Sequence, residues 1–191
     1  MEILLASNNK NKHKELLKIF QESGSKHTLI VNKDIPDVIE DRNTIEENAK
    51  KKAEECYEVF KSPIISDDSG LFVNALDGRP GVHSKRYAGL TSTDVENNQK
   101  LINELKKAEN LSAYFKTVIA FKSSIQESIF TGICKGHILE VPKGDKGFGY
   151  DPVFVPEGYI KSFAELPAET KNDISHRGKA IKRFTEFLNS K

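Results

Sequence analysis

The sequence predicts an α/β fold built on a long mixed β-sheet with flanking helices. Short apolar runs alternate with amphipathic helical patterns along the chain. Two long β-rich runs, 113–121 and 128–139, follow each other closely enough to pair as a hairpin. The elements lack the strict strand–helix–strand rhythm of a dinucleotide-binding fold, which favours a sheet with strands in both directions.

In the first part of the chain, apolar spacing and helix-start signals define the elements. The run Ile3–Ala6 predicts a strand that ends at a polar loop, 7–12, after which apolar residues within 16–20 recur with helical spacing. Thr28–Val31 predicts a second strand. Thr44–Glu47 has the spacing of a capping box, so a helix is expected to begin there and to run to about residue 60.

Further elements follow from turn formers and a second capping box. A strand is expected over 71–76, directly before the dense cluster of turn-forming residues at 77–81. Thr93–Glu96 is a second capping box and predicts another helix. The segment 148–155 is interpreted as a loop that runs into a strand, and a helical region is expected from about residue 168 to residue 188.

Length and composition favour one globular domain, 1–191, in a reducing compartment, the cytoplasm. The chain has 191 residues, of which 37% are hydrophobic, enough for a core without disulfides. Its 29 basic and 28 acidic residues give a net charge of +1, so no bulk field attracts it to nucleic acid or membrane. Neither cysteine lies in a disulfide-framework or zinc pattern, and no apolar run is long enough to span a membrane.

The polar loop Ser7–Lys12 is a candidate phosphate site. Backbone N–H groups at a helix start, together with serine, asparagine and lysine side chains, are suited to bind phosphate. The loop has no glycine and is therefore not a Walker A loop. The alternative is a solvated turn. Helical phase places Lys10, Lys14 and Lys18 on a face opposite the apolar stripe, whereas Lys12 lies at the edge of that stripe, toward a possible pocket.

An acidic pair, Asp67-Asp68, follows an apolar strand and precedes Ser69 and Gly70. Adjacent carboxylates are costly to bury unless a cation neutralises them, and hard oxygen ligands suit Mg²⁺. A simple D-D-S-G turn is the alternative interpretation. Glu40, from an acidic stretch of the chain, is a candidate for a further oxygen ligand; a solvated loop charge is its alternative.

Two later segments carry the remaining candidate residues. In Phe148–Asp151 the aromatic rings could stack on a flat base, and core packing is the alternative. Lys171 and the segment Ser175–Arg177 supply cations and a histidine that could bind phosphate or a base, and a solvated helix face is the alternative.

Taken in order, these motifs resemble the inosine triphosphate pyrophosphatase family, also described as dITP/XTP or non-standard purine NTP pyrophosphatases. The resemblance covers nearly the whole chain. The segments that carry it are Leu4–Asn9 with Lys12, Glu47–Ala49, Asp67–Leu71, Leu76–Gly81, Arg86–Gly89, Gly147–Pro152 and Ser175–Arg177.

The resemblance implies a long mixed sheet that bridges two lobes, a nucleotide cleft between the lobes, and a homodimer. It implies Mg²⁺ as cofactor, with Glu40 and Asp68 as metal ligands and Asp68 as the catalytic residue. The implied substrate-binding residues are Ser7, Asn8, Asn9, Lys12, Lys52, Ser69, Phe148, Gly149, Tyr150, Asp151, Lys171, His176 and Arg177.

The implied activity is hydrolysis of ITP, dITP and XTP to the monophosphate and pyrophosphate, without nucleic-acid or membrane partners. A metal would shield the polyphosphate, lysines would hold the leaving pyrophosphate, and a carboxylate would position or deprotonate water. Two alternatives stay open at this point. One is a pyrophosphatase for other modified nucleotides, and the other is a non-catalytic nucleotide-binding module.

Overall fold

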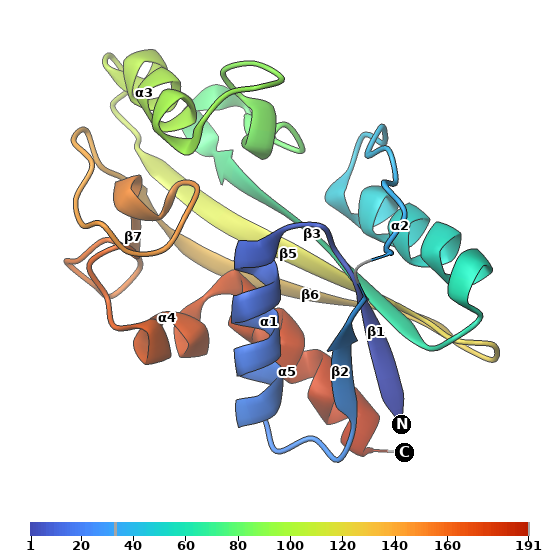
Figure 1. Cartoon of the computed structure of the whole chain (residues 1–191). Coiled ribbons are helices and arrows are strands. Elements are labelled where there is room, and N and C mark those ends of the chain that lie inside the picture. Colours follow the sequence, from blue (N-terminus) through green and yellow to red (C-terminus); the bar gives the residue numbers. More distant parts are fainter. Residues whose placement is uncertain (33, 191) are drawn as a thin grey trace. The chain divides into compact units, whose positions relative to one another are not determined.

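The structure is a computed structural model that describes residues 1–32 and 34–190. Its seven-stranded sheet has the order β2-β1-β3-β5-β6-β7, with β4 beside β3 (Figure 1). The strands are β1 (Glu2–Ala6), β2 (Thr28–Val31), β3 (Ile64–Val73), β4 (Pro80–Gly81), β5 (Ser112–Lys122), β6 (Glu127–Ile138) and β7 (Phe154–Pro156). The pairs β1–β2 and β1–β3 are parallel, whereas β3–β4 and β6–β7 are antiparallel. The predicted α/β fold with a mixed sheet is therefore confirmed.

Helices and strands alternate only in the first part of the chain, from β1 to β3. The helices are α1 (Lys10–Glu22), α2 (Ile45–Phe60), α3 (Asp94–Leu105), α4 (Ala168–Ile174) and α5 (His176–Asn189), and the 3₁₀ turns are η1 (Asn74–Leu76), η2 (Ser84–Arg86) and η3 (Asp151–Val153). Thr93 and Glu96 form the predicted capping box at the start of α3. Thr44 caps α2 by accepting a hydrogen bond from the Glu47 N–H. Both predicted helix starts are confirmed.

Contacts divide the chain into two compact units. Unit 1 comprises Met1–Asp68, Thr117–Gly132 and His176–Lys191, and unit 2 comprises Ser69–Lys116 and Ile133–Ser175. The strands β3, β5 and β6 each contribute residues to both units. Each unit has a hydrophobic core of its own and is described by itself.

The core of unit 1 forms where β1, α1 and α5 bury their apolar residues. Leu16, Ile19 and Phe20 supply the buried stripe of α1, at the spacing that the sequence predicts. Phe184 of α5 is fully buried, and its ring lies 5.6 Å from that of Phe121. Burial of these side chains holds α1 in the core of unit 1. The candidate phosphate loop leads into this helix and is therefore held in the same unit.

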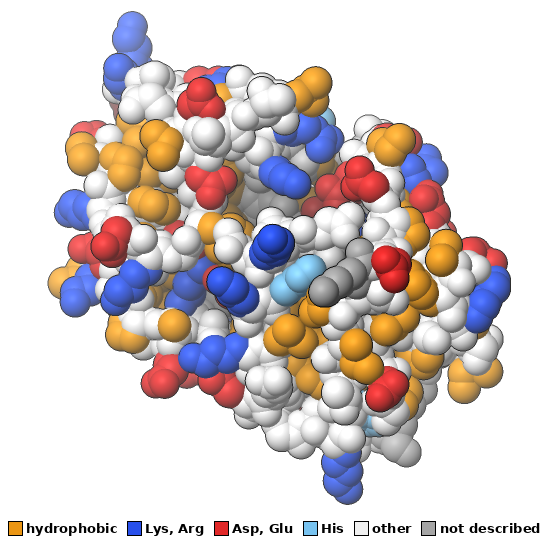
Figure 2. Space-filling view, in the orientation of Figure 1, with side chains coloured by type: hydrophobic (Ala, Val, Ile, Leu, Met, Phe, Trp, Pro, Cys, Tyr) orange, Lys and Arg blue, Asp and Glu red, His pale blue; other side chains and the backbone are white. Residues whose placement is uncertain are grey.

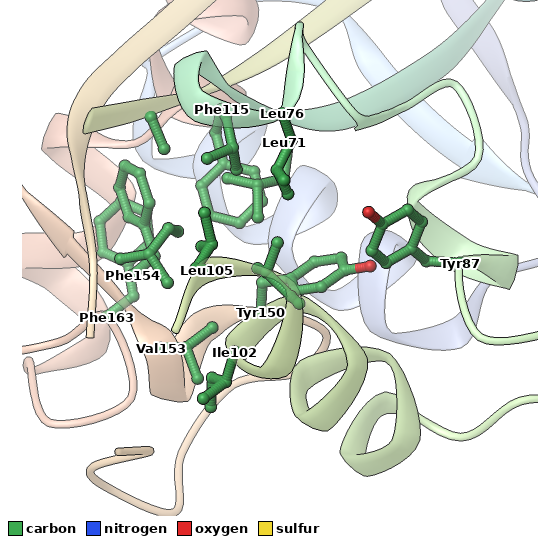
Figure 3. Packing of buried hydrophobic residues seen from close by; sticks show 14 of the residues in the cluster. Leu71, Leu76, Tyr87, Ile102, Leu105, Phe115, Tyr150, Val153, Phe154 and Phe163 are labelled. Atoms are coloured by element: carbon green, nitrogen blue, oxygen red, sulfur yellow. The ribbon is translucent and has the colours of Figure 1, made fainter. Parts of the chain in front are cut away.

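The core of unit 2 is rich in aromatic side chains (Figure 3). The Phe115 and Phe154 rings meet edge to face at a centroid distance of 4.7 Å. Leu105 of α3 and Tyr150 point into the same cluster. This packing joins α3 to the segment that contains the candidate base-binding loop.

Two predicted boundaries are wrong. The strand expected over 71–76 is the end of the ten-residue strand β3, which includes Asp67-Asp68 and ends at Val73, before η1. The acidic pair therefore lies inside a largely buried strand instead of at its end. The single helical region expected at 168–188 is two helices, because Ser175 adopts an extended conformation with ψ 160° between α4 and α5.

Surface charges agree with the near-neutral composition. Basic and acidic side chains are interspersed over the face shown in Figure 2. Among the described residues, none of the helices combines the length and apolar character needed to cross a bilayer.

Candidate functional site

The candidate phosphate loop ends where α1 begins. Helix α1 starts at Lys10, and Asn9 is its N-cap: Asn9 Oδ1 accepts hydrogen bonds from the N–H groups of Asn11 and Lys12. Ser7 Oγ accepts a hydrogen bond from the Asn9 N–H at 3.3 Å. The ring of His13, a residue that the sequence reasoning missed, contacts the Ser7 carbonyl through Nε2. The polar side chains of this loop thus shape the helix start itself.

Lys12 points into unit 1, as its helical phase predicts, while Lys10, Lys14 and Lys18 are exposed. Its Nζ lies 2.9 Å from Oδ2 of Asp67, whose side chain is only 1% exposed. The interpretation of Lys12 as part of a solvated turn is therefore wrong. The pair joins the first turn of α1 to strand β3.

Lys52 of α2 is a second buried cation in unit 1. Its ammonium donates a hydrogen bond to the backbone carbonyl of Asp67 at 2.9 Å and forms an ion pair with Glu40. Burial alone would lower the pKa of Lys52, but the carboxylates of Glu40, Asp67 and Asp68 raise it above its ordinary value. The side chain is therefore charged at neutral pH.

The two adjacent aspartates have opposite electrostatic environments. Burial opposes ionisation of Asp67, but the nearby cations, Lys12 first and then Arg177 and Lys52, hold its pKa below the usual range. For Asp68 burial dominates, and the neighbouring Glu40 and Asp67 carboxylates add to it, so its pKa rises to about 6 despite Lys12 and Lys52. Two neighbouring acids with separated pKa values are suited to different roles.

Lys12 and Lys52 act on both aspartates, whereas Arg177 acts on Asp67. Successive side chains of a β-strand point to opposite faces, so Asp67 and Asp68 leave β3 in opposite directions. The sequence argument assumed that a shared cation must neutralise both. In the structure the Lys12 ammonium pairs with Asp67, and the Glu40 carboxylate is close enough to Asp68 to raise its pKa.

Arg177 and His176 open helix α5 in unit 1, and both are buried. The Arg177 guanidinium forms an ion pair with Glu15 of α1. Sequence reasoning missed Glu15; the available signal was its position three residues after Lys12, on the neighbouring turn of the same helix. The expectation of a solvated helix face is wrong for these two residues.

In unit 2, Asp151 organises the loop that precedes it. Its Oδ2 accepts a hydrogen bond from the Phe148 N–H at 2.8 Å and lies 2.6 Å from the Nζ of Lys171, which is buried in α4. A Cβ at Gly147, where φ is +76°, would lie 2.0 Å from the same oxygen. Glycine is therefore required at this position for both backbone conformation and space.

The two aromatic residues of this loop differ in their environment. Tyr150 is buried in the core of unit 2, which confirms the core-packing interpretation for it (Figure 3). Phe148 is half-buried, and the Lys171 ammonium lies 5.2 Å from its ring centroid. Lys171 is thus held between a carboxylate and an aromatic ring, and the alternative of a solvated helix face is wrong for it too.

The predicted site residues divide between the two units. Unit 1 contains Ser7, Asn8, Asn9, Lys12, Glu40, Lys52, Asp68, His176 and Arg177, and unit 2 contains Ser69, Phe148, Gly149, Tyr150, Asp151 and Lys171. Within the described part of the chain, no three His, Cys, Asp or Glu residues are grouped so that they could hold a metal ion. Glu40 and Asp68 are the predicted metal ligands, both in unit 1.

The sequence of this chain is similar to those of a known protein family. The model of the Ham1 family matches residues 3–187. A dITP/XTP pyrophosphatase of Flavobacterium johnsoniae is 44% identical over 98% of both chains, and one of Oceanobacillus iheyensis is 42% identical over 99% of this chain and 98% of the relative.

Solved structures agree. A HAM1 protein from Coxiella burnetii has a TM-score of 0.92 at 36% identity, with 100% of both chains covered. The Ham1 protein of Staphylococcus aureus has a TM-score of 0.88 at 38% identity over 100% of this chain and 99% of that one. The resemblance seen in the sequence motifs is thereby confirmed, and the chain belongs to the Ham1 family.

Proposed function

We propose that this protein hydrolyses non-standard purine nucleoside triphosphates, namely ITP, dITP and XTP, to the monophosphate and pyrophosphate. Full-length relatives above 40% identity carry the name dITP/XTP pyrophosphatase. The observation that carries the proposal is the cluster in unit 1, where Lys12 and Lys52 lie with the carboxylates of Glu40, Asp67 and Asp68. Such a cluster combines cations for phosphate with an acid that can act as a base.

The carboxylates of Glu40 and Asp68 suit Mg²⁺. Mg²⁺ is commonly bound by one or two carboxylates together with waters and substrate phosphates, so two protein ligands suffice. The raised pKa of Asp68 shows that its charge is incompletely compensated by the lysines around it. When bound there, Mg²⁺ would shield the negative charge of the polyphosphate.

The basic residues are assigned to the triphosphate. Lys12 stands in the first turn of α1, where the positive end of the helix dipole favours an anion, and Lys52 donates a hydrogen bond to the backbone of β3. Ser7 and the backbone near Asn8 are assigned to the same group. Both lysines are held by carboxylates, so their ammonium groups are preorganised and need little reordering when phosphate binds.

Asp68 is assigned to the attacking water. A carboxyl with a pKa of about 6 is mostly ionised at neutral pH and is more basic than an ordinary aspartate. It can therefore accept a proton from water as the bond between the α and β phosphates is cleaved. Asp67, whose pKa is lowered and whose Oδ2 contacts Lys12, is assigned to hold that lysine.

Base recognition is assigned to Phe148–Asp151 and Lys171 in unit 2 and to His176 and Arg177 in unit 1. An aromatic ring provides a stacking surface, and buried polar groups that match a 6-oxo purine are left unpaired by the 6-amino group of adenine. Ser69, the residue after Asp68 on β3, is assigned as a further substrate contact.

Two other functions compete with this one. A pyrophosphatase for other modified nucleotides would share the cluster in unit 1, whereas a non-catalytic binding module would not turn over its ligand. Pyrophosphate release from a panel containing ITP, dITP, XTP, GTP, ATP and a methylated pyrimidine triphosphate, with Mg²⁺ and with a chelator, separates all three. We expect release from the first three substrates, and only with Mg²⁺.

The remaining expectations follow from the family resemblance. We propose a cytoplasmic homodimer that acts on free nucleotides and does not bind nucleic acid. The net charge of +1 supports the last point, because sequence-independent binding to nucleic acid depends on basic surface. Light scattering on the purified protein tests the dimer, and a gel-shift assay at low salt tests the absence of nucleic-acid binding.

A further inference from the structure

Two side chains of helix α3 bind the loop 147–151 through the backbone N–H and carbonyl of one loop residue, Gly149. Asp94 Oδ2 accepts a hydrogen bond from the Gly149 N–H at 2.6 Å, and Asn98 Nδ2 donates one to the Gly149 carbonyl at 3.0 Å. Asp94 and Asn98 are four residues apart and therefore share one face of the helix. The two side chains form a clamp, here called the α3 clamp, on Gly149.

The residues on either side of Gly149 depend on this clamp. Tyr150 is anchored in the core, and its hydroxyl donates to the Ser84 carbonyl at 2.8 Å. Phe148 lies on the other side, and its N–H is bound to Asp151. With Gly149 fixed, Phe148 has a defined position beside Lys171. Without the clamp, the order of the peptide at 149 would depend only on its neighbours, through the Tyr150 anchor and the bonds at Asp151.

Asn98 is an unusual choice for a residue that serves packing. It is 6% exposed, and its helix neighbours Leu101, Ile102 and Leu105 are all apolar members of the core. Its Oδ1 is buried and has no hydrogen-bond partner among the described residues. An unsatisfied buried acceptor is costly, so packing alone does not account for an asparagine at this position. The donor that Asn98 provides to Gly149 is its specific contribution.

The neighbouring Asn97 shows that α3 also supports a second segment. Its Oδ1 accepts the Ala88 N–H at 2.7 Å, and its Nδ2 donates to the Lys85 carbonyl at 3.1 Å. Two adjacent buried asparagines thus bind backbone on two different loops of unit 2.

We propose that Asp94 and Asn98 are positioning residues that set base selectivity through the loop 147–151. The inference rests on the proposed function, in which this loop contacts the purine base. Selectivity between ITP and ATP depends on polar groups held to within fractions of an ångström, whereas the triphosphate contacts in unit 1 are common to both substrates. The α3 clamp therefore affects the choice of base more than turnover.

Four variants test the proposal. Asn98→Asp keeps the shape of the side chain but replaces the donor with a carboxylate oxygen, which cannot donate to the Gly149 carbonyl, and Asp94→Ala removes the acceptor. Asp94→Asn retains an acceptor oxygen while it removes the charge near the helix N-terminus, so it controls for the effect of that charge. Gln99→Ala, which disrupts only the exposed bond from Gln99 to Asn103, controls for changes in α3 itself.

The readouts are the ratio of kcat/KM for ITP to that for ATP and the hydrogen–deuterium exchange of the peptide that covers 147–151. We expect the ratio to fall about three- to tenfold in Asn98→Asp and Asp94→Ala, the range expected for one ordinary hydrogen bond. Exchange at Gly149 should accelerate in the same variants. The ratio and the exchange rate should stay within about twofold of wild type in Asp94→Asn and Gln99→Ala.

The outcomes separate the two proposals. A wild-type enzyme that hydrolyses ITP no better than ATP would refute the proposed function and with it this inference. A wild-type enzyme that prefers ITP, together with an unchanged ratio in both Asp94→Ala and Asn98→Asp, would refute the positioning role alone. Unchanged exchange at Gly149 in both variants would show that the α3 clamp does not order the loop.

Discussion

Lys12 Nζ and Asp67 Oδ2 form an ion pair at 2.9 Å that links the first turn of α1 to strand β3. The carboxylate is buried, so its charge depends on this ammonium and on the other cations nearby. The pair has two consequences: it holds a cation where the phosphate is proposed to bind, and it leaves Asp68 as the less compensated acid.

Loss of Lys12 should destabilise the fold. Lys12→Ala leaves a buried carboxylate without its ion-pair partner, and we expect the free energy of unfolding to fall by about 3 kcal/mol. Adding Asp67→Asn should restore much of that loss because the buried charge is removed. Lys18→Ala, which breaks a half-exposed ion pair with Glu22, should cost less than about 1 kcal/mol and is the matched control. Denaturant unfolding of wild type and these three variants gives the free energies of unfolding. Equal losses in Lys12→Ala and Lys18→Ala would contradict the prediction.

Lys12 should bind every nucleoside triphosphate alike. Phosphate contacts do not distinguish the bases, so Lys12→Ala should lower kcat/KM for ITP and ATP by similar factors. In contrast, His176→Ala and Arg177→Ala should lower kcat/KM for ITP more than for ATP. The resulting change in the ITP/ATP ratio of kcat/KM should correspond to about 1–3 kcal/mol, as for a lost buried polar contact. Steady-state kinetics with ITP, XTP, GTP and ATP provide the ratios. A collapse of selectivity in Lys12→Ala, with none at His176 or Arg177, would reverse this division of roles.

Asp68→Asn should lose most of the activity and stay folded. The substitution keeps the size of the side chain and removes the charge that binds metal or accepts a proton. Turnover of ITP with Mg²⁺ is the measurement, and circular dichroism checks the fold. If the variant retained full turnover, the catalytic role would have to pass to another acid, with Asp67 the first to examine.

The same substitution should stabilise the metal-free protein. An aspartate in an unfolded chain has a pKa of about 3.9, whereas that of Asp68 is raised to about 6 in the fold. The folded state therefore binds more protons between these values, and stability is lost as the pH rises through 6. Asp68→Asn escapes this loss and should be more stable than wild type by about 3 kcal/mol at pH 7 and by much less at pH 4. Chemical denaturation with a chelator present tests it, and equal stability at pH 7 would show that the charge is fully compensated.

Much of unit 1 was predictable because its signals are local. The apolar stripe of α1 and its helical phase correctly separate Lys12 from the exposed Lys10, Lys14 and Lys18. The cap at Thr44, like the cap at Thr93 in unit 2, also follows from spacing within one turn. Helix phase and helix caps can be predicted in this way because both depend only on residues that are close together in the sequence.

The partners of these residues were not predictable, because they come from distant parts of the chain. Nothing local in the sequence pairs Arg177 with Glu15 or places Asp94 against Gly149. The acidic pair was misinterpreted as a strand end because aspartate, serine and glycine usually mark turns. Burial between neighbouring strands overrides that preference in β3.

The most direct test of the proposed function is product analysis after incubation of the purified protein with dITP, ITP or XTP and Mg²⁺. Cleavage between the α and β phosphates predicts stoichiometric monophosphate and pyrophosphate, with ATP hydrolysed far more slowly. Formation of the diphosphate and orthophosphate, or no turnover of any of the three substrates, would contradict it.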